Sequence, residues 1–217
     1  SQVNQKLKIL ASVTRHDILN RVMVISAYSD FIKEGITDPE MKKRIEAISQ
    51  SSDEIRTLIN FTREYQELNS AEPAWQSPDA ILARPLLRNM IPGISPDSSL
   101  EGLEIYADRL LEKVFYNLID NSFRHGADVS KISLSYHLQS NGELIILYED
   151  DGGGVSPEEK TQIFKKGFGK NTGMGLFLIS EILSITGISI SETGEHGKGV
   201  RFEIRVPAGM HRFVTKE

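Results

Sequence analysis

The sequence contains no cysteine among its 217 residues. A disulfide framework, a thiolate nucleophile and a zinc site built on cysteine are therefore excluded. Basic residues are not in excess either, because 25 Lys and Arg stand against 30 Asp and Glu, for a net charge of −5. Without a global positive field to attract phosphates, we expect no nucleic-acid partner.

Long apolar runs are also missing. The longest nearly uncharged stretch, Met174 to Ile190, contains Glu181 and several Ser and Thr residues, and it is shorter than the roughly 18 to 20 apolar residues that a membrane span needs. No signal peptide is visible. Because the helical pattern starts at Ser1, we expect a cytoplasmic C-terminal part of a longer protein. We expect this part to make no direct membrane contact, whether or not the parent chain is membrane-anchored.

The composition, 39% hydrophobic and 25% charged, is that of a globular protein with one large or two small domains. Residues 1–68 have no strand-forming run, and apolar residues recur there at three- and four-residue steps. The pattern breaks at 35–39, where Asp38 is placed to cap and Pro39 to begin a second helix. Two singly striped helices cannot bury both stripes as an isolated hairpin, so we expect a homodimer whose hairpins form a four-helix bundle. The stripe residues are Leu7, Leu10, Ala11, Thr14, Ile18, Val22, Ile25 and Ile32, then Met41, Ile45, Ile48, Ile55, Ile59 and Thr62.

Residues 69–80 contain two prolines and small polar residues around Trp75, a composition typical of a linker that leads into the next domain. We place that domain at residues 75–217, where helical and strand-like patterns mix. The fold class is therefore α+β: a helical hairpin, then an α/β sandwich in which helices cover a mixed sheet. Helices are expected at 79–90, 108–124, 157–165 and 173–186, strands at 103–106, 131–137, 144–149, 188–192 and 200–206, and a hairpin turn at Asn141-Gly142.

Seven of the 17 glycines lie in two clusters between Gly152 and Gly175. Glycine clusters mark places where the backbone comes close to something or takes positive φ. For one cluster alone, an ordinary loop is an equally good interpretation. Neither cluster has the spacing of a Walker phosphate loop or of a Rossmann fingerprint, so both of these nucleotide sites are disfavoured.

A different nucleotide pocket fits these residues. Asp150 follows a predicted strand, where its carboxylate can accept a hydrogen bond from an exocyclic amine such as that of adenine. Gly152 and Gly154 would let the base come close. Gly173 and Gly175 precede an apolar helix, whose free N-terminal amides favour phosphate.

Two asparagines, Asn117 and Asn121, lie four residues apart and therefore on one face of the predicted helix 108–124. Neutral amides suit Mg²⁺, which proteins often hold with few ligands of their own together with substrate phosphates and waters. For the pair taken alone, solvated surface amides are the simpler alternative.

Four motifs follow one another in the sequence: Asn117–Asn121, Asp150-x-Gly152-x-Gly154, Phe164–Phe168 and Gly173-x-Gly175. Their order and spacing resemble the N, G1, F and G2 boxes of the sensor histidine kinase ATP-binding domain. That domain belongs to the wider gyrase, heat-shock chaperone, histidine kinase and mismatch-repair ATPase superfamily. The resemblance covers about Trp75 to Pro207. One departure is the short segment between the F and G2 boxes, where many relatives carry a longer mobile lid.

The resemblance implies an ATP site in which Asp150 contacts adenine, while Asn117 and Asn121 hold Mg²⁺ and phosphate. It also implies that Arg124 reaches phosphate, and His125 at the end of the same helix is a further candidate for nucleotide contact. The other nucleotide-binding candidates are Gly152, Gly154, Phe164, Lys170, Thr172, Gly173 and Gly175.

The resemblance also implies a phosphoryl acceptor other than water. Hydrolytic members of the superfamily carry a Glu four residues before the Mg²⁺-binding Asn, where it serves as general base. That position is Asn117 here, and an amide cannot accept the proton of water.

His16 is the candidate acceptor. On a helical wheel it falls opposite the apolar stripe, so we expect it to be exposed. A lone exposed histidine is usually only solvated, but the ATP pocket downstream and the neighbouring residues, which resemble the family's H box, favour catalysis. Asp17 can accept the proton of one imidazole nitrogen, favouring the tautomer whose other nitrogen attacks phosphorus. By the same resemblance, Asn20 would position a water for dephosphorylating a partner aspartate.

Met23, Val24, Ala27 and Phe31 lie on the His16 side of the same helix. Exposed apolar residues beside a phosphorylatable histidine would form a docking surface for a response-regulator receiver domain. Packing against the chain's own ATP-binding domain is an equally good alternative, and the two can alternate.

The sequence thus predicts the catalytic core of a two-component sensor histidine kinase. It would transfer the γ-phosphoryl group of MgATP to His16 and then to a regulator aspartate, with phosphatase activity as a further expectation. Two alternatives stay open. One is a superfamily ATPase or a protein-serine kinase of the anti-sigma-factor type, which conflicts with Asn117. The other is a scaffold that binds nucleotide and signals only by contact.

Overall fold

The computed structural model describes residues 2–67, 72–126, 128–168 and 173–214. Side chains are described from Ala11 onward, apart from those of 61 and 64–67. The chain divides into two compact units, Ser1–Gln66 and Glu67–Glu217.

The first unit is a helical hairpin. Helix α1 runs over Gln2–Gly35 and helix α2 over Pro39–Glu67. Asp38 caps α2, since its Oδ1 accepts the backbone N–H of Glu40 at 2.9 Å and its carbonyl accepts that of Lys42 at 3.0 Å. The predicted break between the helices is confirmed. Although α1 has 34 residues, no helix in the described ranges is both long and apolar enough to cross a membrane.

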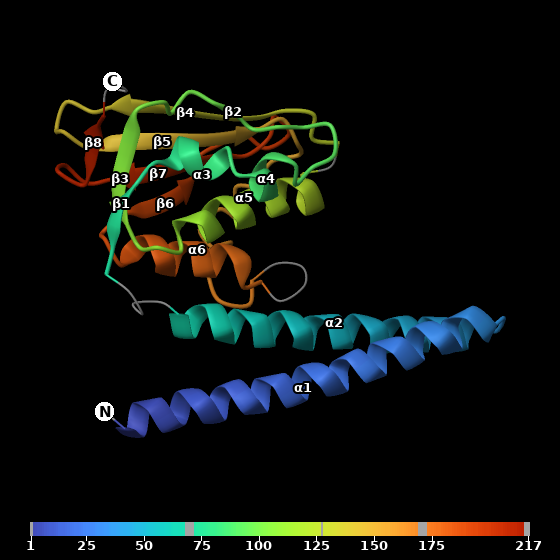
Figure 1. Ribbon diagram of the computed structural model, residues 1–217. Helices are drawn as coiled ribbons and strands as arrows, with labels where there is room; N and C mark the ends of the chain where they lie inside the picture. Colours follow the sequence, from blue (N-terminus) through green and yellow to red (C-terminus); the bar gives the residue numbers. More distant parts are fainter. Residues whose placement is uncertain (1, 68–71, 127, 169–172, 215–217) are drawn as a thin grey trace. The chain divides into compact units, whose positions relative to one another are not determined.

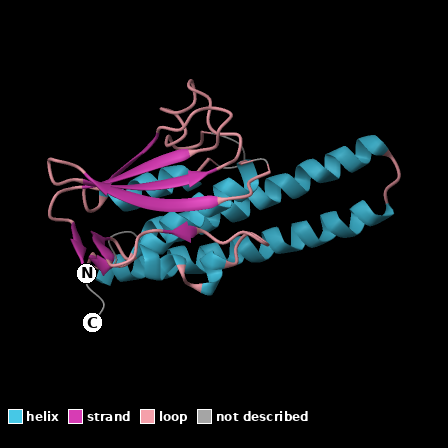
Figure 2. Cartoon of the chain, turned by 90° about the horizontal axis from the view of Figure 1, so that it is seen from above, coloured by secondary structure: helices cyan, strands magenta, loops and turns pink. Residues whose placement is uncertain are grey.

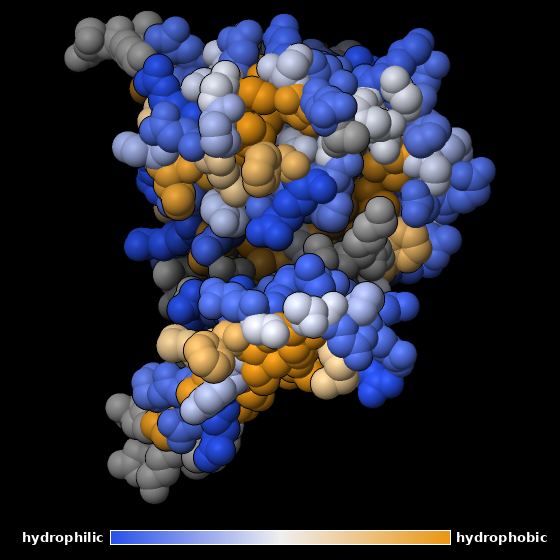
Figure 3. Space-filling model, turned by 90° about the vertical axis from the view of Figure 1, so that its right-hand side faces the viewer, coloured by the Kyte–Doolittle hydropathy of each residue, from blue (hydrophilic) through white to orange (hydrophobic). Residues whose placement is uncertain are grey.

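Only part of the apolar stripe is buried inside the hairpin. Val22 of α1 and Ile45 of α2 are buried, and Lys33 and Glu46 form an ion pair of 3.3 Å between the two helices. Much of the remaining stripe is exposed, and Figure 3 shows orange atoms gathered on the hairpin. The stripe is therefore wider than the surface that one hairpin buries. Its exposed members include Ile25, Ile32, Met41, Ile48 and Ile55.

The second unit contains two sheets, and Figure 2 looks down on the larger one. Its five strands have the order β2-β4-β5-β7-β6, in which β2 pairs with β4 in parallel and all other neighbours are antiparallel. The smaller sheet has the antiparallel order β1-β3-β8. The larger sheet is thus mixed, as expected. The strands are β1 (Ala74–Gln76), β2 (Asp97–Ser98), β3 (Leu103–Ala107), β4 (Ile132–Leu138), β5 (Leu144–Asp150), β6 (Ser189–Glu192), β7 (Arg201–Val206) and β8 (His211–Phe213).

Helices α5 (Leu111–His125) and α6 (Gly175–Ser184) lie along one face of the larger sheet (Figure 1). Buried residues recur in α5 at steps of three and four, as expected for an amphipathic helix. In β5 the first three residues are all buried, and burial alternates only from Ile146 onward. The core of the unit forms between these two layers. It includes Val114, Phe115, Leu118 and Ile119 of α5, Leu144, Ile146 and Tyr148 of β5, and Leu178, Ile179 and Ile182 of α6.

Two of the predicted helices are wrong. The predicted helix 79–90 is split into α3 (Pro78–Leu82) and α4 (Pro85–Arg88). The split arises because a proline disfavours helical backbone in the residue before it, and Arg84 is extended with ψ 140°. The predicted helix 157–165 is a series of turns.

Three short strands, β1, β2 and β8, were not expected. Strand β1 lies inside the predicted linker, where Trp75 packs on Tyr106 with ring centroids 5.5 Å apart and the Arg212 guanidinium lies 4.4 Å from the Trp75 ring centroid. Strands of two or three residues are too short to show an alternating pattern. The expected fold class, a helical hairpin followed by an α/β domain, is nevertheless confirmed.

Candidate functional site

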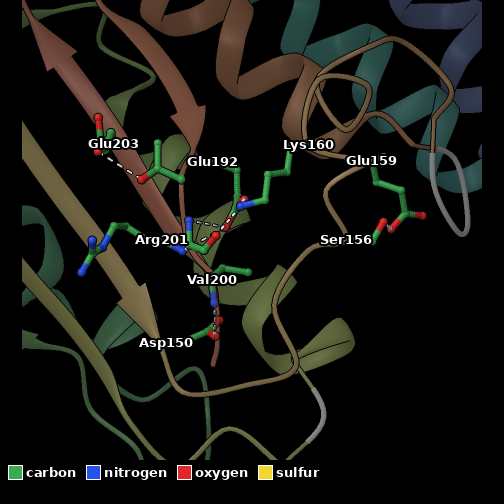
Figure 4. Close-up of polar contacts among 10 residues, drawn as sticks. Asp150, Ser156, Glu159, Lys160, Glu192, Val200, Arg201 and Glu203 are labelled. Carbon is green, nitrogen blue, oxygen red and sulfur yellow. Dashed lines mark hydrogen bonds and ion pairs between the residues drawn. The ribbon is translucent and has the colours of Figure 1, made fainter. Parts of the chain in front are cut away.

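Asp150 ends strand β5 and is nearly buried, with 7% of its surface exposed. Its Oδ1 accepts the backbone N–H of Gly152 at 3.0 Å and that of Val200 at 3.1 Å, and the contact with Val200 is drawn in Figure 4. Its Oδ2 accepts the hydroxyl of Ser122 from α5. A buried carboxylate needs such donors because loss of water destabilises its charge. Residues from α5, from the turn after β5 and from the entry to β7 thus fix one carboxylate.

Tyr148 continues this set of hydrogen bonds into the core. Its hydroxyl lies 2.8 Å from the Oγ of Ser122, and both side chains are buried. Burial raises the pKa of Tyr148 well above its ordinary value; the hydrogen bond to Ser122 opposes this rise, and the charge of Asp150 adds to it. The phenol therefore keeps its proton and is a permanent donor.

Asp151, the next residue, accepts hydrogen bonds from a different segment of the chain. Its Oδ1 accepts the backbone N–H groups of Ser130 at 2.8 Å and of Lys131 at 2.9 Å, and its Oδ2 accepts the Ser130 hydroxyl. These hydrogen bonds, above all the one from the Ser130 side chain, lower the pKa of Asp151 to about 2. The Asp151 carboxylate ties the end of β5 to the segment that leads into β4, so its acceptors are occupied by the chain itself.

The two asparagines of α5 are partnered differently. The Nδ2 of Asn117 donates to the Lys113 carbonyl at 2.8 Å, and a Cβ added at Gly175 would lie 3.2 Å from the Asn117 Oδ1. The start of α6 and the Asn117 acceptor are therefore close neighbours. The Nδ2 of Asn121 is buried and has no hydrogen-bond partner among the described residues. An unpaired buried amide is a place where a polar ligand fits.

Helix α6 begins at Gly175 with Met174 in the N-cap position, and no side chain caps it. Its first backbone amides can bind an anion, which the helix dipole also favours. No three His, Asp or Glu side chains in the described ranges gather as metal ligands. The Asn117 Oδ1, beside the start of α6, is an amide oxygen of the kind that can bind a divalent cation together with phosphates of a ligand.

The glycines after β5 pack against the chain's own backbone. A Cβ on Gly152 would lie 2.1 Å from the Gly126 carbonyl oxygen, to which the Gly153 N–H also donates at 2.7 Å. Gly154 has φ +72°, and a Cβ there would lie 2.7 Å from the carbonyl oxygen of Gly199. We expected glycine at 152 and 154 because a base approaches; the structure gives a different reason, the contact between this turn and its neighbouring backbone segments.

Glu192 is a second buried carboxylate, with none of its side chain exposed. Its Oε1 accepts the backbone N–H of Gly194 at 2.9 Å and that of Arg201 at 3.2 Å. Its Oε2 lies 2.8 Å from the Lys160 Nζ as an ion pair without hydrogen-bond geometry, while the ammonium donates to the Gly194 carbonyl. Figure 4 shows Lys160 reaching across to Glu192. The pair fastens the turns after β5 to the β6–β7 connection.

Described residues on either side of positions 169–172 contact one another and strand β7. Phe164 packs edge-on against Phe202 of β7, with ring centroids 6.1 Å apart. The Gly167 N–H donates to the Gly173 carbonyl at 3.2 Å, and Gly173 has φ +59°. Two candidates for nucleotide contact, Lys170 and Thr172, lie outside the described residues.

Arg124 and His125 lie at the C-terminal end of α5 and are exposed. The Nε of Arg124 donates to the Oδ1 of Asp120 at 2.8 Å, and this hydrogen bond and the charge of Asp120 raise the pKa of Arg124. The guanidinium is therefore paired within α5.

His16 of the hairpin has 73% of its side chain exposed, as the helical wheel predicts. Its Nδ1 lies 3.4 Å from the Oδ1 of Asp17. The Nδ2 of Asn20 lies 3.3 Å from Nδ1 and 3.4 Å from Nε2. If the Nδ1–H donates a hydrogen bond to Asp17, Nε2 keeps its lone pair. The imidazole is accessible, and Asp17 and Asn20 are its two polar neighbours.

Four residues of this region were missed from the sequence: Ser122, Tyr148, Lys160 and Glu192. Ser122 directly follows Asn121, and Tyr148 points to the same face of β5 as Asp150 because side chains alternate along a strand. For Ser122 and Tyr148, the signal in the sequence was a polar residue at a position that faces the core. Lys160 and Glu192 are far apart in the sequence, and no short-range pattern connects them.

Comparison with known proteins shows what this arrangement is similar to. Residues 107–210 match the family described as histidine kinase-, DNA gyrase B- and HSP90-like ATPase. The chain is 26% identical over 224 residues to the sensor protein SrrB of Staphylococcus aureus, covering 93% of the chain and 38% of that protein. It is 23% identical over 241 residues to histidine kinase P4 of Formosa agariphila, covering 100% of the chain and 17% of that protein.

Solved structures share the fold. The Acinetobacter baumannii histidine kinase AdeS aligns with a TM-score of 0.58 at 20% identity, over 89% of this chain and 98% of that chain. Full-length ShkA in complex with AMPPNP aligns with a TM-score of 0.63 at 20% identity, over 91% of this chain and 45% of that chain. The chain spans less than two fifths of the length of the two curated relatives named above.

The contact between Gly152 and Gly126 predicts a sharp difference between two adjacent glycines. We expect Gly152→Ala to lower the free energy of unfolding by about 3 kcal/mol, because its methyl group would overlap a backbone carbonyl that cannot move alone. Gly153→Ala is the matched control. The nearest atom to its Cβ is the Gly126 oxygen at 4.0 Å, so we expect a change below about 1 kcal/mol. Urea unfolding measures both; equal effects would contradict the assigned contact.

The buried ion pair makes a second prediction. Lys160→Met leaves the Glu192 carboxylate buried without its cation, and we expect a loss of about 3–5 kcal/mol in the free energy of unfolding. The double variant Lys160→Met with Glu192→Met should recover most of that loss, since an apolar pair of similar volume carries no desolvation penalty.

Lys198→Met, in the β6–β7 connection, provides the control for removing a lysine that forms an ion pair. Its ion pair with Glu195 is exposed on both sides, so we expect an effect below about 1 kcal/mol. Chemical denaturation of the three variants tests the pair, and a Lys160→Met chain as stable as Lys198→Met would show that Glu192 does not depend on the cation.

Proposed function

We propose, from the premise that this chain is a sensor histidine kinase core, that it transfers the γ-phosphoryl group of MgATP to His16. The phosphoryl group would then pass to an aspartate of a response-regulator receiver domain. The observation that carries the proposal is that one chain combines the buried, amide-held carboxylate of Asp150 with an exposed His16 flanked by Asp17 and Asn20.

ATP would bind to the second unit. Asp150 supplies a fixed acceptor for the exocyclic amine of adenine, and the amides at the start of α6 supply donors for phosphate. Asn121 contributes its unpaired Nδ2 as a further donor. Mg²⁺ would bind the amide oxygens of Asn117 and Asn121 and would neutralise phosphate charge as the transfer proceeds.

His16 would act as the nucleophile. In the tautomer that Asp17 favours, the Nε2 lone pair forms the new bond to the γ-phosphorus while the bond to the bridging oxygen breaks and ADP leaves. The imidazole becomes positively charged, and Asp17 stabilises the Nδ1–H that carries this charge. Positioning and charge neutralisation would therefore supply most of the rate.

Water is a poor acceptor of the phosphoryl group in this site. The residue four positions before Asn121 is Asn117, whose Nδ2 is bonded to the Lys113 carbonyl and which cannot take a proton from water. This favours transfer to His16 over ATP hydrolysis. Asn20, one turn from His16, would orient a water when the partner's phospho-aspartate docks, so we include phosphatase activity in the proposal.

Two surfaces of α1 suit two partners. Met23, Val24, Ala27 and Phe31 are exposed on the side of His16, and Phe31 has 76% of its surface exposed. They would receive the receiver domain. The exposed stripe on the other side would pair with a second hairpin, so the functional unit is a homodimer with a four-helix bundle.

The phosphoacceptor assignment is tested by His16→Gln. After incubation with γ-labelled ATP and Mg²⁺, we expect the unchanged chain to carry an acid-labile, base-stable label on the His16 peptide, and the variant to carry none. ATP affinity should stay within about twofold, because His16 belongs to the other unit. Label retained in His16→Gln would sink the assignment.

Asp150→Asn separates binding from transfer. The substituted amide presents two donors of its own where the pocket needs acceptors, so we expect ATP affinity to fall by at least about tenfold, and labelling with it. Titration with a fluorescent ATP analogue measures the affinity. A chain that binds ATP but never labels His16 would favour the scaffold alternative.

The proposed dimer is tested by a substitution in the exposed apolar stripe of the hairpin. We expect Ile48→Glu to shift the chain from dimer to monomer in sedimentation equilibrium, because a charge would enter the apolar bundle core. Met23→Glu, on the His16 side, is the control and should leave the dimer intact. Dimer dissociation by both variants, or by neither, would contradict this division of the surface.

A further inference from the structure

The hydrogen bonds behind Asp150 have only one consistent direction. Asp150 Oδ2 is an acceptor, so the Ser122 hydroxyl must donate to it. The Ser122 proton is then committed, and the Tyr148 hydroxyl, 2.8 Å away, must donate to the Ser122 Oγ. The raised pKa of Tyr148 keeps that proton in place. The three residues form a relay from the core to the carboxylate: Tyr148 O–H to Ser122, and Ser122 O–H to Asp150.

The relay decides which acceptor site of the carboxylate stays available. Each carboxylate oxygen accepts about two hydrogen bonds. Oδ1 is saturated by the N–H groups of Gly152 and Val200, while Oδ2 receives only the Ser122 hydroxyl. One acceptor position on Oδ2 therefore remains, and its direction is set by Ser122.

The same relay removes a donor from the pocket. A serine hydroxyl that could rotate freely would be able to donate to a carbonyl group of a base. Here Tyr148 donates into the serine oxygen and Asp150 takes its proton, so Ser122 has no hydrogen left for a ligand. A base with a carbonyl facing Oδ2 would meet an acceptor and no donor, and unpaired buried acceptors are strongly unfavourable.

We propose that Ser122 and Tyr148 are positioning residues that fix Asp150 as an acceptor-only contact and so select purines with an exocyclic amine over purines with a carbonyl at that position. This inference rests on the proposed ATP site and adds the source of its base preference. Both residues act through Asp150, and neither needs to touch the nucleotide.

The test compares three triphosphates that differ only at the base: ATP, inosine triphosphate, which carries the carbonyl, and purine riboside triphosphate, which carries neither group. Affinities are measured by calorimetry with Mg²⁺. For Ser122→Ala we expect the Kd of ATP to rise about tenfold, the scale of one hydrogen bond to a charged group. The Kd of purine riboside triphosphate should stay within about twofold.

Tyr148→Phe gives a second, milder variant. The serine then keeps a free acceptor site but loses the group that fixes its direction, so we expect the preference for ATP over inosine triphosphate to shrink about threefold. If Ser122→Ala does not fold, this variant decides the question alone. Its control is Tyr136→Phe on the neighbouring strand β4, and Thr186→Val, which loses another buried hydroxyl of the same unit, controls for Ser122→Ala.

The outcomes separate this inference from the proposed function. Equal loss of affinity for ATP and purine riboside triphosphate would mean that Ser122 serves only the stability of the unit, and would overturn the inference. Unchanged discrimination in both variants would overturn it as well. Failure of the unchanged chain to bind ATP at all would instead contradict the proposed function and everything that rests on it.

Discussion

The second unit depends most on the burial of one charge. A carboxylate removed from water must find donors inside the protein, and Asp150 finds them in three places that are far apart in the sequence: Ser122, Gly152 and Val200. Satisfying this one group therefore fixes α5, the turn after β5 and the entry to β7 against one another. The hydrogen bond from Ser122 to Asp150 also fixes the site residues of α5, since Asn121 is the immediate neighbour of Ser122.

Two buried carboxylates bind consecutive backbone amides at the entry to β7, and they differ in one respect. Val200 donates to Asp150, and Arg201 donates to Glu192. Glu192 completes its coordination inside the protein with the ammonium of Lys160. Among the described residues, Asp150 has no such ion pair, and it keeps an acceptor position. A carboxylate that is fully paired stabilises the fold, whereas one held by neutral donors with an acceptor left over can bind a ligand.

The sequence predicted the layers and the polar residues but not the connections between them. The hairpin break, the mixed sheet and the exposure of His16 follow from periodicity and capping, which act over a few residues. The Tyr148–Ser122 relay and the pair of Lys160 with Glu192 join residues that are 26 and 32 positions apart, so only the folded chain brings them together. The glycine at position 152 was correctly predicted to mark a close approach to the backbone, but the approaching group is the Gly126 carbonyl of the protein itself.

The hairpin shows how one periodic stripe can serve two partners at once. Val22 and Ile45 use part of the apolar surface to hold α1 against α2. The exposed members of the stripe on α1, Ile25 and Ile32, fall roughly opposite His16 around that helix, because a helix turns about 100° per residue. A second hairpin covering that stripe would leave the side of α1 around His16 open to solvent. Dimerisation and access to His16 are therefore compatible by geometry, and whatever binds beside Phe31 competes only with other partners of the same face.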